Sequence, residues 1–335
     1  MNKNILTIIT EGGKTFGLGH ITRCLSISSA FKKFNYDVNF IINGDDSVIP
    51  MLNDRYIIFN WLKDESMLID NIKQSTLVLI DSIKISDCQI LKIQKLHKKL
   101  IFIDDDKRRN ILNTGFVLYW TVLSEEKNYF NPKKENVKYL IGSKYTPLRG
   151  EFNKAKKNDI NENIKNILIT FGGSDIRNLT PLILNNLVKR FPLIEKNIII
   201  GPGFDNKKEI EKYKDNYTNF IFNANTQQMI TLMQENDIAI ACGGQTLYEL
   251  AKIGTPTIAI LVVDNAKDDT LGWNEVGTLD YIGTWEDIDL IDNLITSIST
   301  LKNRKLRLKM QQNSLPYISD NGTSLLVTKI IENLK

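Results

Sequence analysis

The chain has 335 residues, and its 43 basic and 39 acidic side chains leave a formal net charge of +4 with no long block of like charge, which argues against nucleic-acid binding. The three cysteines lack Cys-x-x-Cys spacing, as is typical of a reducing compartment. The apolar start is too short for a signal sequence and no apolar run reaches bilayer length, so we expect a cytoplasmic protein without stable membrane insertion, whose oligomeric state stays open.

The first half alternates short aliphatic runs with amphipathic segments. Strands are expected at residues 5–10, 37–42, 76–80 and 100–103, and a helix is expected to begin near Ile21 after a Gly-rich turn. Residues 153–163 are polar and without periodicity. They are expected to link an N-terminal domain, residues 1–152, to a second domain, residues 164–320.

The second half repeats the pattern. Strands are expected at residues 164–171, 198–200, 220–222, 238–241 and 257–263, and an amphipathic helix at residues 323–334. Strands that alternate with helices predict parallel sheets with right-handed crossovers. The expected fold class is therefore α/β, with two Rossmann-like domains facing an interdomain cleft and a C-terminal helix, residues 321–335, that packs back on the N-terminal domain.

The turn after the first strand carries the main candidate for catalysis. Gly17 and Gly19 let the backbone approach a ligand, and the helix N-terminus that follows attracts negative charge. His20 comes next, with an ordinary pKa of about 6.5, which suits proton abstraction from water or a sugar hydroxyl, and the helix N-terminus favours its neutral form. The alternative is that His20 only caps the helix. We favour a base, because the other histidine, His97, lies in a Lys-flanked helical segment and is expected to be solvated.

Two glycine-containing segments resemble nucleotide-binding motifs but do not match them fully. Gly13-Lys14-Thr15 resembles the end of a phosphate-binding P-loop, but the required upstream glycine would fall at Ile8, inside the strand. The segment from Gly17 to Thr22 lacks the third glycine of a dinucleotide fingerprint. Neither an ATPase nor a dehydrogenase is supported, and no cofactor is expected.

A run of aspartates could suggest a metal site. Asp104, Asp105 and Asp106 follow a strand, but the basic residues 107–109 come directly after them without a nearby histidine. We expect a solvated turn and no metal.

Two loops of the second half are candidates for binding phosphate. Gly172 and Gly173 end a strand and lead through Ser174, Asp175 and Asn178 into a helix, where Ser174 or Asp175 could equally be a simple cap.

The other loop is the segment Gly243-Gly244-Gln245-Thr246, which places N–H groups and a hydroxyl at a helix N-terminus, as a diphosphate site requires. Glu249, one turn later, could accept from ribose hydroxyls or simply pair with the helix dipole. Asp264 and Asn265 follow the next strand and are expected at the same edge.

These motifs resemble a family: hydrolases that remove UDP from a diacetamido-trideoxyhexose in pseudaminic acid synthesis, and related spore-coat polysaccharide proteins. Gly-Leu-Gly-His-Ile-Thr-Arg-Cys at 17–24 is similar to its Gly-x-Gly-His-x-x-Arg-Cys signature, and residues 171–180 are similar to a second signature. The resemblance covers nearly the whole chain and extends to the loop at 243–249, the Gly-x-Pro at 254–256 and the Leu-Arg-x-x-Phe at 148–152.

The resemblance implies the GT-B glycosyltransferase fold, a UDP-sugar substrate, and His20 as the base that activates water for attack at the anomeric carbon. This chain departs from the family at three places: Ile9 and Glu11 replace an Arg-x-Asp, Ser82 and Ile83 replace the tyrosine after the strand-terminal Asp81, and Ala266 follows Asn265 in place of a glutamine. These positions are expected to bind the sugar more than the nucleotide.

Three functions remain open: a UDP-sugar hydrolase, a glycosyltransferase in which His20 deprotonates an acceptor hydroxyl, and a nucleotide-sugar binding module without activity. The candidate catalytic residue is His20. The candidate substrate-binding residues are Gly17, Gly19, Arg23, Asp81, Gly172, Gly173, Ser174, Asp175, Asn178, Gly243, Gly244, Gln245, Thr246, Glu249, Asp264 and Asn265.

Overall fold

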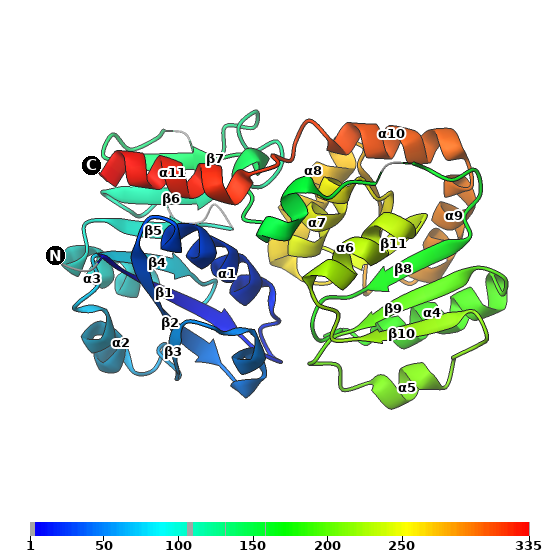
Figure 1. Cartoon of the computed structure of the whole chain (residues 1–335), viewed down its shortest axis with the longest axis horizontal. Coiled ribbons are helices and arrows are strands. Elements are labelled where there is room, and N and C mark those ends of the chain that lie inside the picture. Colours follow the sequence, from blue (N-terminus) through cyan, green and yellow to red (C-terminus); the bar gives the residue numbers. More distant parts are fainter. Residues whose placement is uncertain (1–3, 106–109, 131, 158, 335) are drawn as a thin grey trace. The chain divides into compact units, whose positions relative to one another are not determined.

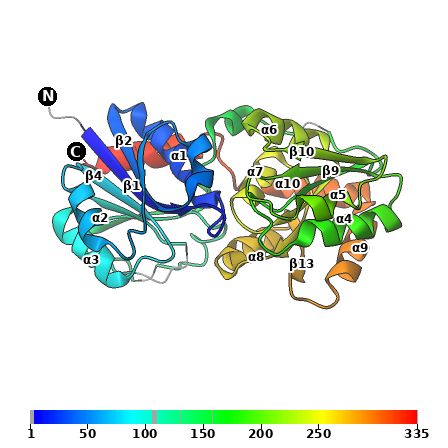
Figure 2. The ribbon, with the colours of Figure 1, turned by 90° about the horizontal axis from the view of Figure 1, so that it is seen from below.

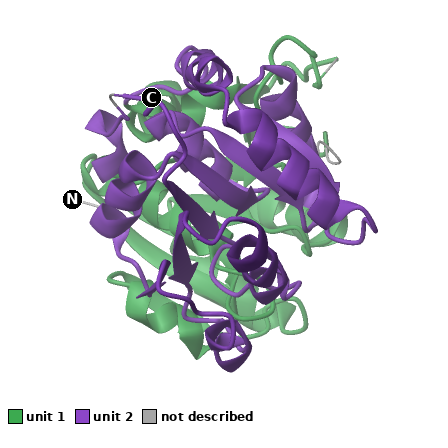
Figure 3. Cartoon of the chain, turned by 90° about the vertical axis from the view of Figure 1, so that its right-hand side faces the viewer, with its two compact units in different colours: residues 1–150, 321–335 green, residues 151–320 purple. Residues whose placement is uncertain are grey.

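The structure is a computed structural model that describes residues 4–105, 110–130, 132–157 and 159–334, and it divides into two compact units (Figures 1 and 3). Unit 1 comprises residues 1–150 and 321–335, and unit 2 comprises residues 151–320. The last helix, α11 (Gly322–Leu334), packs in unit 1 against α1 (Gly19–Lys32). Its start is fixed by the Thr323 hydroxyl, which donates to the Leu148 carbonyl at 2.7 Å.

Within the described residues, seven parallel strands form the sheet of unit 1 in the order β3-β2-β1-β4-β5-β6-β7. Ile8 of β1 lies opposite Phe40 of β2 on one side and Leu79 of β4 on the other. The bounds are β1 (Asn4–Gly12), β2 (Tyr36–Gly44), β3 (Arg55–Ile58), β4 (Leu77–Asp81), β5 (Leu100–Ile103), β6 (Gly115–Tyr119) and β7 (Val137–Ile141).

Helices cover both faces of this sheet (Figure 2). On one face, α2 (Glu65–Ile72) and α3 (Asp87–Leu96) bury Leu68 and Ile90 in a cluster with Ile9 and Val78 of the strands. Because successive strand residues point to opposite faces, the alternate strand residues are directed to the other face, where α1 packs on β1. Three short 3-10 helices, η1 (Asp46–Met51), η2 (Ser143–Tyr145) and η3 (Gly150–Lys154), lie in connecting segments.

In unit 2, the described residues form a six-stranded parallel sheet in the order β10-β9-β8-β11-β12-β13. Leu184 of α4 and Leu294 of α9 share a buried cluster with Ile169 and Ile240 of the strands. The strands are β8 (Asn166–Thr170), β9 (Glu195–Ile200), β10 (Thr218–Phe222), β11 (Ile238–Cys242), β12 (Thr257–Leu261) and β13 (Leu279–Thr284). The helices are α4 (Leu179–Arg190), α5 (Lys207–Glu211), α6 (Thr226–Glu235), α7 (Gln245–Ile253), η4 (Asp264–Ala266), α8 (Lys267–Glu275), α9 (Leu290–Leu301) and α10 (Arg304–Ser314).

The polar segment expected as a linker, residues 153–163, packs on unit 2 in the part that the structure describes. The Lys157 ammonium donates to the carbonyls of Gln234 and Asn236 at 2.5 and 2.8 Å, and Asn161 donates to the Asp237 carboxylate at 2.8 Å. The polar side chains of this segment thus have partners at the C-terminal end of α6 and just before β11.

Both sheets change direction at one place. In unit 1, β2 and β3 are added in turn on one side of β1, and the chain then returns to place β4 on the other side of β1. In unit 2, β9 and β10 are added in the same way on one side of β8, and β11 lies on its other side. The loops after β1 and β4, and those after β8 and β11, therefore flank a switch point, which is where ligands bind in open parallel sheets. Among the described helices, none is both long and apolar enough to cross a bilayer.

Candidate active site

The catalytic candidate of unit 1 lies at the switch point. Gly17 has a φ of +74° and closes the turn after β1 by accepting from Gly13 N at 3.0 Å. A positive φ is one that glycine adopts without steric cost. Helix α1 then begins at Gly19, so His20 stands in its first turn, beside Asp81 at the carboxyl end of β4.

His20 and Asp81 form a buried acid–base pair. His20 Nδ1 lies 2.8 Å from Asp81 Oδ1, and the two residues are 9% and 0% exposed. An ionised carboxylate can only accept, so Nδ1 carries the proton of the neutral ring and the lone pair is on Nε2. Nε2 has no hydrogen-bond partner among the residues that the structure describes.

Arg23 fixes the Asp81 carboxylate from the other side. Its Nε donates to Asp81 Oδ2 at 2.7 Å, and Nη2 donates to Asp81 Oδ1 and, at 2.6 Å, to Asp105 Oδ2. Arg23 Nη2 also lies 3.0 Å from His20 Nδ1. The two hydrogens of Nη2 are directed to the carboxylates of Asp81 and Asp105, so Nη2 is not a donor to Nδ1. The Arg23 guanidinium additionally lies 5.2 Å from the centre of the Trp120 ring, which restricts its position further.

The Cys24 thiol completes the shell around Asp81, since Sγ donates to Oδ2 at 3.2 Å. Burial and the neighbouring Asp81 charge raise the pKa of this thiol well above its ordinary value, so it stays protonated and remains a donor. Asp81 therefore orients His20 and contacts protein groups on both oxygens.

The pKa of His20 corrects one sequence-based expectation. Burial lowers the pKa and Arg23 also lowers it, but the Asp81 charge and hydrogen bond raise it, and the net pKa is above the ordinary value. The helix N-terminus alone was expected to keep His20 neutral, but it does not dominate. Burial would raise the pKa of Asp81, yet Arg23 and His20 hold it far below its ordinary range, so this carboxylate is ionised at neutral pH.

The expected solvated turn at residues 104–106 is wrong in its described part. Asp104 is 2% exposed, and Asp105 accepts two hydrogen bonds from Arg23. Asp106 and the basic residues 107–109 lie outside the described residues. His20, Asp81 and Asp105 bring oxygen and nitrogen atoms within 4.8 Å of one another, but the Arg23 guanidinium forms ion pairs with both carboxylates. This arrangement is a buried network of hydrogen bonds and ion pairs.

His97 was expected to be solvated, but it is half-buried at the end of α3. Its backbone N–H donates to Ile93 O at 2.8 Å. Burial lowers its pKa, and its Nε2 is buried without a partner in the described part of the chain. His97 is the C-cap residue of α3.

Two of the departures from the family pattern contact each other. The Ser82 hydroxyl donates to Glu11 Oε1, and the same oxygen accepts from Lys84 N at 3.2 Å. Ile85 N in turn donates to the Ser82 hydroxyl at 2.9 Å. Glu11, at the end of β1 and 1% exposed, thus holds the loop after β4, so the two replacements form one local structure beside His20 and Asp81.

In unit 2, the loop after β8 shows one of its predicted residues as a helix cap. Asp175 accepts from Leu179 N and Thr180 N, both at 2.9 Å, and from the Asn206 amide at 2.9 Å. Asn178, with a φ of +54°, joins the same amide network. Gly172 and Gly173 are half-exposed, and a Cβ built on Gly172 would meet nothing within 4 Å, so its backbone is open to a ligand.

The loop after β11 has the geometry expected of an anion site. Gly244 is the N-cap residue of α7 and has a φ of +119°, so no capping side chain covers the start of this helix. A Cβ built on Gly244 would meet nothing within 4 Å. The first N–H groups of a helix lack partners within the helix, and they favour an anion there. Gln245 and Thr246 are half-exposed at this end, whereas Glu249, one turn on, is 4% exposed and therefore less accessible than expected.

Gly243 shows how the last predicted pair reaches the same edge. A Cβ at Gly243 would lie 2.6 Å from the Thr270 hydroxyl and 2.8 Å from Ala266 Cβ. The short helix η4, which contains Asp264 and Asn265, is therefore packed directly on this glycine. The structure thus brings the loops after β11 and β12 together.

Several residues at these edges were not predicted. Arg177 stacks 4.2 Å from the centre of the Trp285 ring and donates to Val262 O at 3.1 Å. Asn206 bridges Asp175 and Asn178, and Asp105 and Trp120 hold Arg23. Each follows a strand of a parallel sheet, and this position is the one signal in the sequence that could have identified them.

Comparisons with known proteins place this geometry in context. A family described as a protein of unknown function (DUF354) matches residues 170–334. An uncharacterized protein of Methanocaldococcus jannaschii is 32% identical over 76% of this chain and 55% of its own length. The chain therefore spans about half of that relative.

Two further relatives have informative names. The spore coat polysaccharide biosynthesis protein SpsG of Bacillus subtilis is 22% identical over 98% of this chain and 97% of its own. The pseudaminic acid cytidylyltransferase and UDP-2,4-diacetamido-2,4,6-trideoxy-beta-L-altropyranose hydrolase of Helicobacter pylori is 25% identical over 75% of this chain and 43% of its own.

Solved structures identify the fold. MurG of Acinetobacter baumannii superposes with a TM-score of 0.66 at 15% identity, covering 98% of this chain and 99% of that one. Arabidopsis thaliana UGT89C1, in its complex with UDP, gives a TM-score of 0.66 at 10% identity, covering 98% and 99%. With its two parallel-sheet Rossmann-like units, the chain has the GT-B glycosyltransferase fold, as predicted.

Proposed function

We propose that this protein hydrolyses a UDP-linked amino- or deoxysugar, similar to a UDP-2,4-diacetamido-2,4,6-trideoxyhexose, to UDP and the free sugar in nonulosonic acid or surface polysaccharide biosynthesis. The observation that carries the proposal is the hydrogen bond from His20 Nδ1 to the buried Asp81, which directs the ring's lone pair to Nε2. The names of the Bacillus and Helicobacter relatives supply the substrate class.

In this proposal, His20 Nε2 takes a proton from water as the water oxygen bonds to the anomeric carbon. The bond from that carbon to the diphosphate oxygen breaks, and its electron pair leaves with UDP. The imidazolium that forms is stabilised by Asp81, which is ionised at neutral pH because Arg23 and His20 lower its pKa. The carboxylate thus stabilises the imidazolium of the transition state more than the neutral imidazole from which this step starts.

Unit 2 supplies the nucleotide site in this proposal. The N-terminus of α7 and the open backbone at Gly244 would accept the diphosphate, and the helix dipole would stabilise the leaving UDP without a required metal. The half-exposed Thr246 would add a hydroxyl donor. The substrate is a nucleotide sugar, and we propose no nucleic-acid partner.

A glycosyltransferase is the second candidate function, because the solved structures that share the fold include glycosyltransferases. His20 would then take its proton from an acceptor hydroxyl in place of water. The Glu11–Ser82 contact joins two of the positions that differ from the hydrolase pattern and that we expect to bind the sugar. UDP release that requires an added acceptor would favour this reaction.

The test is incubation with a panel of UDP-sugars, with free sugar and UDP quantified by mass spectrometry. Because the chain has two histidines, His97→Ala is a matched control for His20→Ala. We expect free sugar from the wild type and from His97→Ala, and none above background from His20→Ala. Tight UDP binding without turnover of any panel member would instead indicate a binding module and would contradict the proposal.

A further inference from the structure

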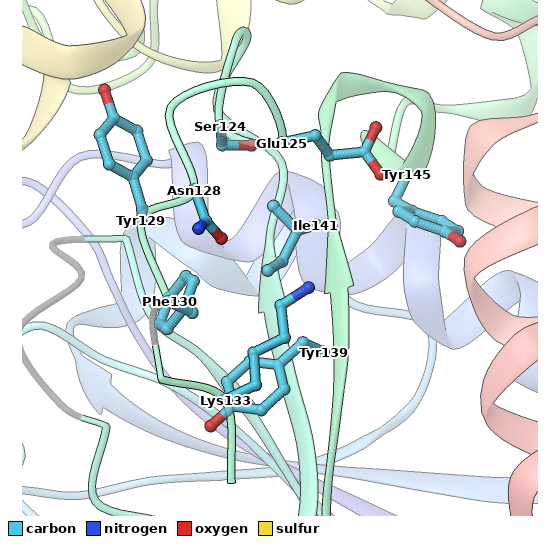
Figure 4. Close-up of a pocket in the computed structure, with 9 residues that line it drawn as sticks. All are labelled: Ser124, Glu125, Asn128, Tyr129, Phe130, Lys133, Tyr139, Ile141 and Tyr145. Carbon is cyan, nitrogen blue, oxygen red and sulfur yellow. The ribbon is translucent and has the colours of Figure 1, made fainter.

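Unit 1 contains a cavity that shares no residue with the His20 network. It has a volume of about 150 Å³ and lies over the edge strand β7, beneath the loop that joins β6 to β7 (Figure 4). The same loop begins with Trp120, which packs on Arg23, four residues before the first cavity residue, Ser124.

Aromatic side chains give the cavity a fixed apolar wall. The Phe130 ring packs against Tyr119 of the core at a centroid distance of 5.6 Å and against Tyr139 at 5.4 Å. The Tyr139 hydroxyl donates to Asn110 Oδ1 at 2.6 Å and accepts from Lys134 N at 3.2 Å, so it is directed away from the cavity while the ring lines it.

Polar groups are directed into the same space. Figure 4 shows the Asn128 amide and the Lys133 ammonium near Ile141, in the middle of the lining side chains. Ser124 also lines the cavity; it is 1% exposed, and its hydroxyl has no hydrogen-bond partner within the described residues. Buried hydroxyls almost always have a partner, so this one calls for a ligand or a water at the cavity wall.

The acidic side chain at the rim is already neutralised. Glu125 Oε1 accepts from the Lys144 ammonium at 2.7 Å, and a Cβ at Gly142, whose φ is +105°, would lie 2.9 Å from Glu125 Oε2. The carboxylate is therefore held against glycine backbone, as an acceptor for a neutral ligand rather than a site for a cation.

We infer that this cavity binds one monosaccharide unit. A cavity of about 150 Å³ holds one six-membered ring, whereas a single water occupies about 30 Å³. The Phe130 and Tyr139 rings suit the apolar face of a pyranose, and the Ser124, Asn128 and Lys133 groups suit its hydroxyls. The inference does not depend on the proposed hydrolysis, because none of these residues contacts His20.

Saturation-transfer NMR with free N-acetylglucosamine as the probe tests this site on the full chain. We expect transfer to the sugar at millimolar concentrations, unchanged when UDP is present in excess. Two variants keep the backbone compatible: Ser124→Ala removes the hydroxyl without adding volume, and Asn128→Gly suits the φ of +48° at that position. Each removes a hydrogen bond to the ligand, so the Kd should rise about two- to tenfold.

Ser124→Ala gives the sharper result, because it removes a buried hydroxyl that has no hydrogen-bond partner within the described residues. Its melting temperature should stay equal or rise while sugar binding weakens, whereas a purely structural role would lower both. Tyr56→Phe, on the exposed part of β3, is the matched control and should bind as the wild type does. The inference is overturned if the probe shows no transfer, if UDP abolishes the transfer, or if both variants bind the probe like the wild type.

Discussion

Asp81→Asn removes the charge at the centre of the His20 network with almost no change in volume. In the wild type, burial and Arg23 lower the pKa of His20, and the charge and hydrogen bond of Asp81 raise it above its ordinary value. Without that charge, the lowering effects dominate, so the pKa of His20 should fall below the wild-type value and below about 6.5. The amide could also donate to Nδ1 and force the ring proton onto Nε2, where it would block the base.

The magnitude follows from the contacts. Asp81 is fully buried and accepts from His20, Arg23 and Cys24, and the removal of one member of such a pair costs about 3–5 kcal/mol. Because Asp105 still pairs with Arg23, we expect a loss of about 3 kcal/mol in the free energy of unfolding. The turnover rate should fall roughly 10³- to 10⁴-fold, as expected when a base is held in the wrong tautomer.

The pH dependence has a definite sign. The folded-state pKa of Asp81 is depressed, so its stabilisation is present at neutral pH and is lost as the pH falls through that depressed pKa. The raised pKa of His20 adds stabilisation that is complete below its unfolded value, about 6.5, and is lost as the pH rises through the folded value. In Asp81→Asn both contributions should disappear. Because the pKa of His20 should then lie below its unfolded value, the variant should lose stability as the pH falls below about 6.5.

The assay is an NMR titration of the ring protons of the two histidines, with His97 as the internal control. Asp105→Asn is the matched variant, because Asp105 contacts Arg23 but makes no hydrogen bond to His20, and it should lower the pKa of His20 less. A His20 pKa that stays the same or rises in Asp81→Asn, together with a rate near that of the wild type, would refute the reasoning.

Two further predictions concern unit 2. Gly243→Ala should lower the free energy of unfolding by about 1–3 kcal/mol and weaken UDP binding, because the new methyl group would overlap the Thr270 hydroxyl. Chemical denaturation measures the first effect and calorimetry the second. An unchanged denaturation midpoint would contradict the close contact between Gly243 and Thr270. Asp175→Ala should lower the free energy of unfolding by about 1–2 kcal/mol, because Leu179 N loses the carboxylate that caps the helix. Ser174→Ala is the control; it removes no cap hydrogen bond within the described residues and should leave the free energy of unfolding nearly unchanged. Burial raises the pKa of Asp175, so the site disfavours the charged carboxylate. Asp175→Asn, which keeps an acceptor oxygen, should therefore lower the melting temperature less than Asp175→Ala. The reverse order would show that the charge itself is needed.

The sequence predicted those parts of the fold that local chemistry determines. The central strands carry continuous aliphatic runs because both faces of a parallel sheet are buried, so β1, β4, β8 and β11 were found with small errors in their bounds. The edge strands β3, β7 and β13 are half-exposed and carry charged residues such as Arg55, Lys138 and Asp280, so their runs are interrupted. Strand β6 has an apolar run and could have been found.

The candidate site was predicted where it depends on one turn and missed where it depends on sheet order. His20 was identified from its place after Gly19, which is local. That Arg23 pairs with Asp105 follows from β5 lying beside β4, and no local pattern encodes that neighbour relation. The same is true of the Glu11–Ser82 contact, which joins the ends of β1 and β4.

Hydrolysis in water enriched in heavy oxygen tests most directly the claim that His20 activates water at the anomeric carbon. We expect UDP-sugar to give free sugar and UDP without heavy oxygen in its phosphates, at equal rates for the wild type and His97→Ala, and no reaction for His20→Ala. Heavy oxygen in the phosphate of the released nucleotide, or release by His20→Ala at the wild-type rate, would contradict the account.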